Sequence, residues 1–237
     1  MEAMVFAAGL GTRLHPLTQF TPKAMVKLKG RPLIDHVIKR LVEAGVESIV
    51  VNVHHYAEQI IGFIESQDYG VPVYISDERT QLLDTGGGLK FASKFFTGKQ
   101  PILIHNVDVY SDIDFGKMLQ YHQENDAIAT LAVRSRETSR YLLFDDYFVL
   151  KGWENMKTGA VKLVSPDHEL NRFAFSGIHI VSPQIFEQMH DEGTFSIIDL
   201  YLKLVHQSKI QAFTHDDSFW MDIGRVSHLN ELEKLLE

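Results

Sequence analysis

Residues 4–18 read MVFAAGLGTRLHPLT, and the triplet TPK follows at positions 21–23. The apolar run predicts a buried strand that breaks directly into a glycine-rich turn. Two glycines let the backbone approach a ligand closely, and the successive N–H groups of such a turn can surround phosphate oxygens. Arg13 adds a planar guanidinium group, which can bind two phosphate oxygens at once, and Lys23 adds a compact ammonium group. This stretch therefore predicts a strand followed by a polyphosphate-binding loop.

Strands and helices alternate after this loop. Helical spacing of apolar residues predicts helices over 32–44 and 56–66, and buried strands are predicted over 48–54 and 71–76. This alternation predicts an α/β fold with three α/β/α layers, Rossmann-like, around a mostly parallel central sheet. Ligands of such sheets bind at the carboxyl ends of the strands, where the glycine loop lies.

The rhythm changes near residue 139, where short strands joined by turns predict a small antiparallel β extension. We expect one domain over residues 1–237, with a nucleotide-binding half over 1–135. Residues 136–237 form the other half and include the extension. A strand over 173–181 carries Ser176 and Gly177 in its middle, and a glycine inside a strand often marks the close approach of a ligand.

Three further stretches place polar groups at this sheet edge. Residues 85–88, TGGG, open a helix and present bare backbone at close range. Asp108 ends an apolar strand that begins near residue 101, and Asp222 ends a second apolar stretch. Two carboxylates at the ends of apolar stretches, 114 positions apart, are typical of a metal site that folding assembles.

Composition excludes several classes of protein. The 237 residues are 45% apolar, enough for a full core, and the net charge of −8 indicates no nucleic-acid-binding face. The chain has no cysteine, which excludes disulfides and thiol catalysis and fits a reducing cytoplasm. We expect neither a signal peptide nor a membrane segment. The oligomeric state, monomer or homodimer, stays open.

The pattern Gly-x-Gly-Thr-Arg-x-x-Pro-x-Thr followed by Pro-Lys resembles the signature of the sugar-1-phosphate nucleotidylyltransferases, which have a glycosyltransferase-A-like (GT-A-like) fold. The 85–88 run resembles the family's base- and ribose-binding segment, and Trp-x-Asp-Ile-Gly at 220–224 resembles its second metal-binding segment. Where the family has Gly-Asp, this chain has Asn106-Val107-Asp108. Short bacterial mannose-1-phosphate guanylyltransferases and N-acetylmuramate-1-phosphate uridylyltransferases look most similar, which leaves the base and the sugar open.

The resemblance implies transfer of a nucleotidyl group from a nucleoside triphosphate to a sugar 1-phosphate, with release of pyrophosphate. It implies Mg²⁺ held by Asp108 and Asp222, and Arg13 and Lys23 as catalytic cations. The implied nucleotide-binding residues are Ala8, Gly9, Gly11, Thr12, Arg13, Thr85, Gly86, Gly87 and Gly88. The expected sugar-phosphate contacts are Asn106, Glu154, Asn155, Lys157, Ser176 and Gly177. Because the second pKa of a phosphomonoester is about 6, the attacking oxygen needs no general base at neutral pH.

The sequence excludes some other functions and leaves others open. A dinucleotide-binding loop would have glycine at position 14, where this chain has leucine, and no Walker sequence occurs. A cytidylyltransferase for another phosphomonoester, such as phosphocholine, is an alternative, and so is a non-catalytic nucleotide-sugar-binding regulator. The histidines, including His122, His168 and His190 on predicted surfaces, lack the spacing of a zinc site.

Overall fold

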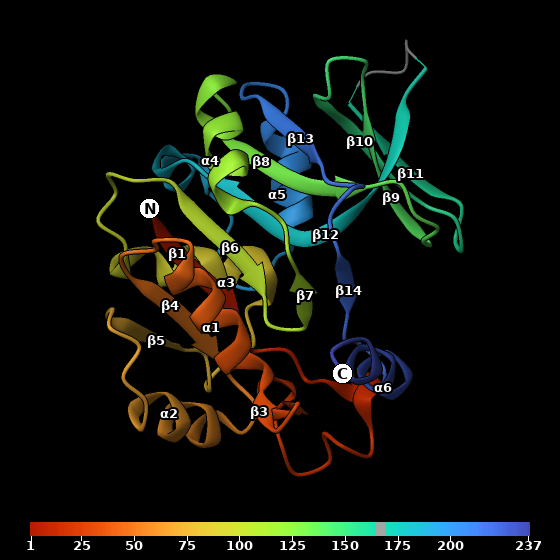
Figure 1. Ribbon diagram of the computed structural model, residues 1–237. Coiled ribbons are helices and arrows are strands. Elements are labelled where there is room, and N and C mark those ends of the chain that lie inside the picture. The colour runs from red at the N-terminus through yellow and green to blue at the C-terminus, as the bar shows by residue number, and fades with distance from the viewer. Residues whose placement is uncertain (165–168) are drawn as a thin grey trace.

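The computed structural model describes residues 1–164 and 169–237. Its core is one twisted sheet with the strand order β5-β4-β1-β6-β12-β8-β13 (Figure 1). The strands β5, β4, β1 and β6 are mutually parallel, β12 is antiparallel to β6, and β8 and β13 are parallel to each other. These strands are β1 Glu2–Phe6, β4 Ile49–Val53, β5 Val73–Asp77, β6 Ile102–Asn106, β8 Ala129–Arg134, β12 Asn171–Val181 and β13 Ile210–Thr214.

Helices cover both faces of this sheet. Side chains alternate along β1, so that Ala3 and Val5 join one core and Met4 joins the other. The first core lies under α1 Leu33–Glu43, α2 Ala57–Glu65, α4 Phe115–Glu124 and α6 Val226–Leu235, and the second under α3 Asp84–Ala92 and α5 Ile197–Leu204. The predicted three-layer arrangement is therefore confirmed.

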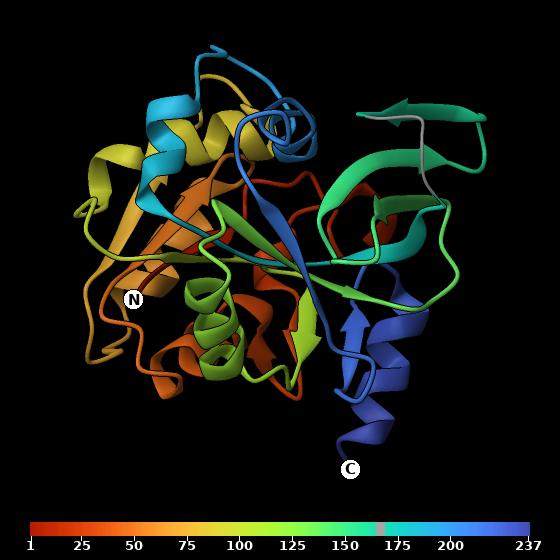
Figure 2. The ribbon, with the colours of Figure 1, turned by 90° about the horizontal axis from the view of Figure 1, so that it is seen from above.

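The predicted antiparallel extension is confirmed as well. It consists of β9 Arg140–Phe144, β10 Leu150–Asn155 and β11 Ala160–Leu163. β9 pairs with the first residues of β12, whose last residues pair with β6 and β8, so the extension continues the main sheet (Figure 2). A register shift between Phe175 and His179 separates the two ends of β12.

The remaining elements are short. Hydrogen bonds join β2 Lys27–Leu28 to β3 Arg31–Pro32 and β7 Val109–Ser111 to β14 Trp220–Asp222. Single 3₁₀ turns form over Thr12–Leu14, Lys23–Met25 and Ser93–Phe95, and a longer 3₁₀ helix forms over Pro183–Gln188. No helix in the described part of the chain is long and apolar enough to cross a membrane.

Candidate active site

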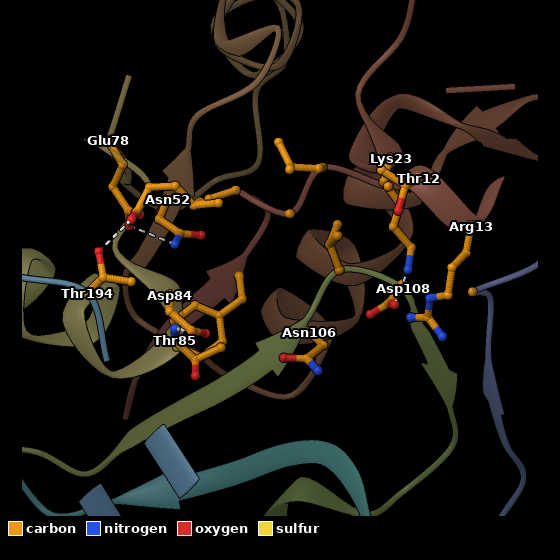
Figure 3. Close-up of a pocket in the computed structure, with 18 residues that line it drawn as sticks. Thr12, Arg13, Lys23, Asn52, Glu78, Asp84, Thr85, Asn106, Asp108 and Thr194 are labelled. Carbon is orange, nitrogen blue, oxygen red and sulfur yellow. Dashed lines mark hydrogen bonds and ion pairs between the residues drawn. The ribbon is translucent and has the colours of Figure 1, made fainter. Parts of the chain in front are cut away.

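The carboxyl ends of the parallel strands surround a cavity of about 550 Å³ (Figure 3). The loop that follows β1 forms one wall, and Asn106 and Asp108 after β6 form another. Seven of the residues predicted to bind the nucleotide or to act as catalytic cations line this cavity: Ala8, Gly9, Gly11, Thr12, Arg13, Lys23 and Thr85. Four polar side chains that sequence reasoning missed also line it: Asn52, Glu78, Asp84 and Thr194.

The two loop glycines have different roles. Gly11 has φ of 65°, and a Cβ there would lie 3.0 Å from Lys23 Cβ and 3.2 Å from Thr18 Cγ2. The Thr18 hydroxyl donates to the Gly11 carbonyl at 2.8 Å, which fixes this turn. A Cβ on Gly9 would meet no atom within 4 Å. The fold therefore requires glycine at position 11, whereas Gly9 leaves open space on the cavity wall.

A short ladder brings the two predicted metal-binding aspartates together. Asp222 is the last residue of β14 and pairs with Val109 of β7, directly after Asp108. The Ile223 N–H donates to the Asp108 carbonyl at 2.7 Å. These contacts explain how residues 114 positions apart reach the same site.

Two cations and two carboxylates lie close together around this ladder. Lys23 forms an ion pair with Asp108, and the two side chains are 10% and 17% exposed. Burial raises the pKa of Asp222 and the charge of Asp108 raises it further, while Lys23 and Arg13 oppose the shift. Asp222 Oδ1 is buried without a hydrogen-bond partner in the described residues. This carboxylate is thus held beside two cations with one oxygen unsatisfied.

These residues fit a hard divalent cation. Carboxylate oxygens are the ligands that Mg²⁺ prefers, and it is commonly held by one or two carboxylates together with substrate phosphates. The unsatisfied Asp222 Oδ1 and the neighbouring Asp108 supply such a pair. Residues 1–164 and 169–237 contain no cluster of three or more histidine, cysteine, aspartate or glutamate side chains that could hold a metal.

The far end of the cavity carries a buried carboxylate. Glu78 Oε1 accepts from Asn52 Nδ2 at 2.8 Å, and Asn52 Oδ1 accepts from the Ala7 N–H at 2.8 Å. Burial raises the pKa of Glu78, and its hydrogen bonds with Asn52 and the Leu83 N–H oppose the shift. The sequence held a signal for this pair, because Asn52 interrupts an apolar strand and Glu78 directly follows the next strand.

The run Gly86–Gly88, which we expect to meet the nucleotide, does not line the cavity. The N–H groups of Gly86 and Gly87 donate to the Phe195 carbonyl at 2.9 and 3.2 Å. A Cβ on Gly87 would lie 2.2 Å from the Gly193 carbonyl oxygen, and one on Gly88 would lie 2.8 Å from Glu78 Oε1. The glycines make room for segment 193–195, which carries Thr194 to the cavity.

A second cavity of about 580 Å³ lies between the β extension and α5. Asp84 lines both cavities, and Asp222 lies on the wall of the second. The other polar or aromatic residues on its wall are Arg136, Thr138, Arg140, Trp153, Lys162, Phe175, Ser196 and Asp199. Lys162 Nζ lies 2.6 Å from Asp199 Oδ1 and 5.5 Å from the centre of the Trp153 ring.

The expected sugar-phosphate contacts on the extension lie elsewhere. Glu154 is buried and forms an ion pair with Arg172. Neighbouring side chains of β10 point to opposite faces of the sheet, and Trp153 is the one that lines the cavity. Asn155 and Lys157 lie at the β10–β11 turn, where the Lys157 N–H donates to Asn155 Oδ1 at 3.0 Å. None of the three lines a cavity described above.

The two expected contacts on β12 are also absent from both walls. The Ser176 hydroxyl is buried and lies 2.6 Å from His215 Nε2. Gly177 has φ of 74°, and a Cβ there would lie 2.7 Å from Asn106 Nδ2. This glycine therefore admits the Asn106 side chain, and Asn106 itself lines the first cavity.

The histidine predictions have mixed outcomes. His122, predicted at the surface, is buried between the hydroxyls of Thr130 and Ser182. His190 is exposed as predicted. His168 lies outside the described residues.

Comparisons with known proteins agree with this geometry. The sequence profile of a family described as "Nucleotidyl transferase" matches residues 2–237. The chain is 32% identical to an N-acetylmuramate alpha-1-phosphate uridylyltransferase of Caulobacter vibrioides, over 94% of this chain and 91% of that protein. It is 30% identical to mannose-1-phosphate guanyltransferase 2 of Candida glabrata, over 95% of this chain but only 62% of that longer protein.

Solved structures show the same fold. HddC from Yersinia pseudotuberculosis complexed with GMP-PN superposes with a TM-score of 0.78 at 21% identity, covering 100% of this chain and 99% of that one. A UDP-glucose pyrophosphorylase from Acinetobacter baumanii superposes with a TM-score of 0.80 at 18% identity, covering 98% and 91%. At these identities the likeness extends to the fold alone.

Proposed function

This chain belongs to the nucleotidyl transferase family, and from that premise we propose that it transfers a nucleotidyl group from a nucleoside triphosphate to a sugar 1-phosphate, releasing pyrophosphate. The observation that carries the proposal is the β7–β14 ladder, which brings Asp222 beside Asp108 at a cavity that also holds Arg13 and Lys23. Two acids and two cations at one sheet edge suit phosphoryl chemistry, in which positioning and charge neutralisation do most of the work.

Each cavity suits one substrate. In the first, the loop over Ala8–Arg13 receives the triphosphate, while Asn52 and Glu78 lie at the far end, where polar groups can meet the base. In the second, Trp153 offers an aromatic face for a sugar ring, and Lys162 and Asp199 offer hydrogen bonds to its hydroxyls. Asp84 lies where the two cavities meet, and Asp222 borders the second cavity close to Arg13 of the first.

The acceptor phosphate attacks the α-phosphorus, and the bond from that phosphorus to the bridging oxygen of the leaving pyrophosphate breaks. The attacking oxygen is already deprotonated at neutral pH, because the second pKa of a phosphomonoester is about 6. Arg13 lies beside Asp222 and binds the departing pyrophosphate with its fork of donors. Lys23, now paired with Asp108, binds the α-phosphate.

We assign Asp108 and Asp222 to a magnesium ion. The chemistry that magnesium supplies when bound is neutralisation and alignment of phosphate oxygens. The support is the donor set, two neighbouring carboxylates with one oxygen unsatisfied. Since nucleoside triphosphates are cytoplasmic metabolites, we place the reaction in the cytoplasm.

The wall of the second cavity does not by itself separate phosphocholine from a sugar 1-phosphate. Its three cations are matched by the carboxylates of Asp84, Asp199 and Asp222, and its aromatic rings could also meet a quaternary ammonium group. Phosphocholine therefore belongs among the acceptors to be tested.

A pyrophosphate-release screen tests the proposal. Four nucleoside triphosphates are combined with sugar 1-phosphates, including a carboxylated sugar, and with phosphocholine, each with magnesium and with EDTA. The Asp222→Asn variant is the matched control, because it keeps the side-chain shape and removes the charge. We expect turnover with at least one sugar 1-phosphate, only with magnesium. Release that requires no acceptor, or release with phosphocholine alone, would contradict the proposal.

A further inference from the structure

Arg136 lies at the ligand edge although nothing in its sequence context marks it. It follows the end of β8 at Arg134 by two residues. β6 and β8 are each antiparallel to β12, so β8 ends at the same edge of the sheet as β6, near Asp108. Arg136 thereby reaches the wall of the second cavity. Burial lowers the pKa of Arg136, and the charge of Asp222 opposes that shift.

The guanidinium group is held firmly and keeps donor capacity. Its carbon lies 4.5 Å from the centre of the Trp220 ring, and Nη2 donates to the Phe175 carbonyl at 3.2 Å. Trp220 is itself fixed, because its Nε1 donates to the Ser176 carbonyl at 2.8 Å. Arg136 Nε is buried and has no hydrogen-bond partner among the described residues. A buried unsatisfied donor on a charged group is costly unless a ligand completes it.

The other two cations of this cavity are placed differently. Lys162 forms an ion pair with Asp199 and lies over Trp153, on the extension side. Arg140 begins β9 and pairs in register with Asn155 at the end of β10. Arg136 instead packs against Trp220 of β14, the strand that ends at Asp222. It therefore lies on the β14 side of the cavity, whose wall it shares with Asp222 and Trp153.

We propose that Arg136 binds the phosphate of the acceptor sugar and is a catalytic residue of the transfer. The assignment rests on the proposed function above. The acceptor must place its phosphate between the α-phosphate and its own sugar ring, and Arg136 lines the same cavity as Asp222 and Trp153. When a phosphate oxygen of the acceptor attacks the α-phosphorus and pyrophosphate leaves, two anions are brought together, and Arg136 reduces their repulsion.

Substitution of Arg136 tests the assignment against a neighbouring arginine. Arg136→Gln removes the charge and keeps much of the side-chain length, and Arg136→Lys keeps the charge and loses the fork. Arg134→Gln is the control, because Arg134 reaches the carbonyls of Ser218 and Asp216, both at 3.5 Å, and lines neither cavity. KM for each substrate, kcat and the melting temperature are measured for all variants.

For Arg136→Gln we expect at least a tenfold rise in the sugar 1-phosphate KM and a ten- to hundredfold loss of kcat. The nucleoside triphosphate Kd, measured by calorimetry without acceptor, should stay within threefold of wild type. Arg136→Lys should recover part of the loss, and Arg134→Gln should match wild type in both KM values.

Three outcomes overturn the assignment in distinguishable ways. If the wild-type chain turns over a sugar 1-phosphate and Arg136→Gln behaves like Arg134→Gln, the proposed function stands and the role of Arg136 is wrong. If Arg136→Gln lowers the melting temperature and weakens the binding of both substrates equally, the role of Arg136 is structural. If the wild-type chain turns over no acceptor at all, the proposed function fails and the assignment fails with it.

Discussion

Substitution of Gly224 should lower catalytic activity while leaving the stability of the fold nearly unchanged. A Cβ at this position would lie 2.6 Å from Asp222 Oδ1 and 3.2 Å from both Arg13 Cζ and Arg13 Nη1. Ordinary contact begins near 3.4 Å, so in Gly224→Ala the Asp222 carboxylate must retreat by about 0.8 Å. The Arg13 guanidinium must move as well. Both are ends of side chains, so the backbone can stay in place.

The expected loss follows from that displacement. A shift of about 1 Å at a reacting group costs on the order of a hundredfold in rate, or about 2.7 kcal/mol of transition-state stabilisation. The free energy of unfolding should change by less than about 1 kcal/mol, because no core atom is touched. We therefore expect Gly224→Ala to fold normally and to lose about 99% of kcat/KM.

Pyrophosphate release and urea denaturation measure the two effects on the same preparation. Gly62→Ala is the matched control, because a Cβ there meets nothing within 4 Å and the residue lies inside α2. That change should leave activity intact and stabilise the fold by about 0.5–1 kcal/mol. Activity of Gly224→Ala within threefold of wild type would refute the idea that Asp222 and Arg13 must hold these positions.

Three further outcomes follow from the structure. Gly87→Val should displace the segment that contains Gly193, and limited proteolysis should then show new cleavage in that segment. The variant should also bind nucleotide more weakly in calorimetry. Absence of new cleavage would refute this prediction. Asp108→Asn and Asp222→Asn should each abolish magnesium-dependent turnover, and the double variant should be no worse, whereas multiplicative losses would indicate separate roles. Burial lowers the pKa of His122 from 6.5 to about 4, so the folded state binds fewer protons than the unfolded chain between these values. Its contribution to the free energy of unfolding should fall by about 3 kcal/mol between pH 7 and pH 4, and His122→Gln should flatten that slope in urea titrations.

The sequence was sufficient for the α/β layers because the elements that build them are long. A helix such as α1 presents three turns of apolar spacing, and a strand such as β4 is buried throughout. β7 and β14 have three residues each, too few to show a period, so the ladder that joins Asp108 to Asp222 could not be predicted. The family resemblance supplied those two aspartates, and their contact is a property of the folded chain.

Sequence could not say which face of a strand a side chain takes. On β10 the neighbouring residues Trp153 and Glu154 point to opposite sides, so Trp153 lines the cavity and Glu154 does not. The Gly86–Gly88 run lies off the cavity wall for another reason. A glycine indicates that something approaches the backbone closely, and here the partners are Phe195, Gly193 and Glu78 of the same chain.

The position of Asp84 at the junction of the two cavities has a consequence for inhibition by product. Under the proposed function, a nucleotide-sugar is one molecule that would occupy both cavities, whereas each substrate would occupy one. Joining two weak binders raises the effective concentration of each end for its own pocket, so the product can bind more tightly than either substrate. Both ends must leave before the next cycle begins. Departure of the product, rather than the chemical step, is then the natural limit on turnover, and its accumulation slows its own synthesis.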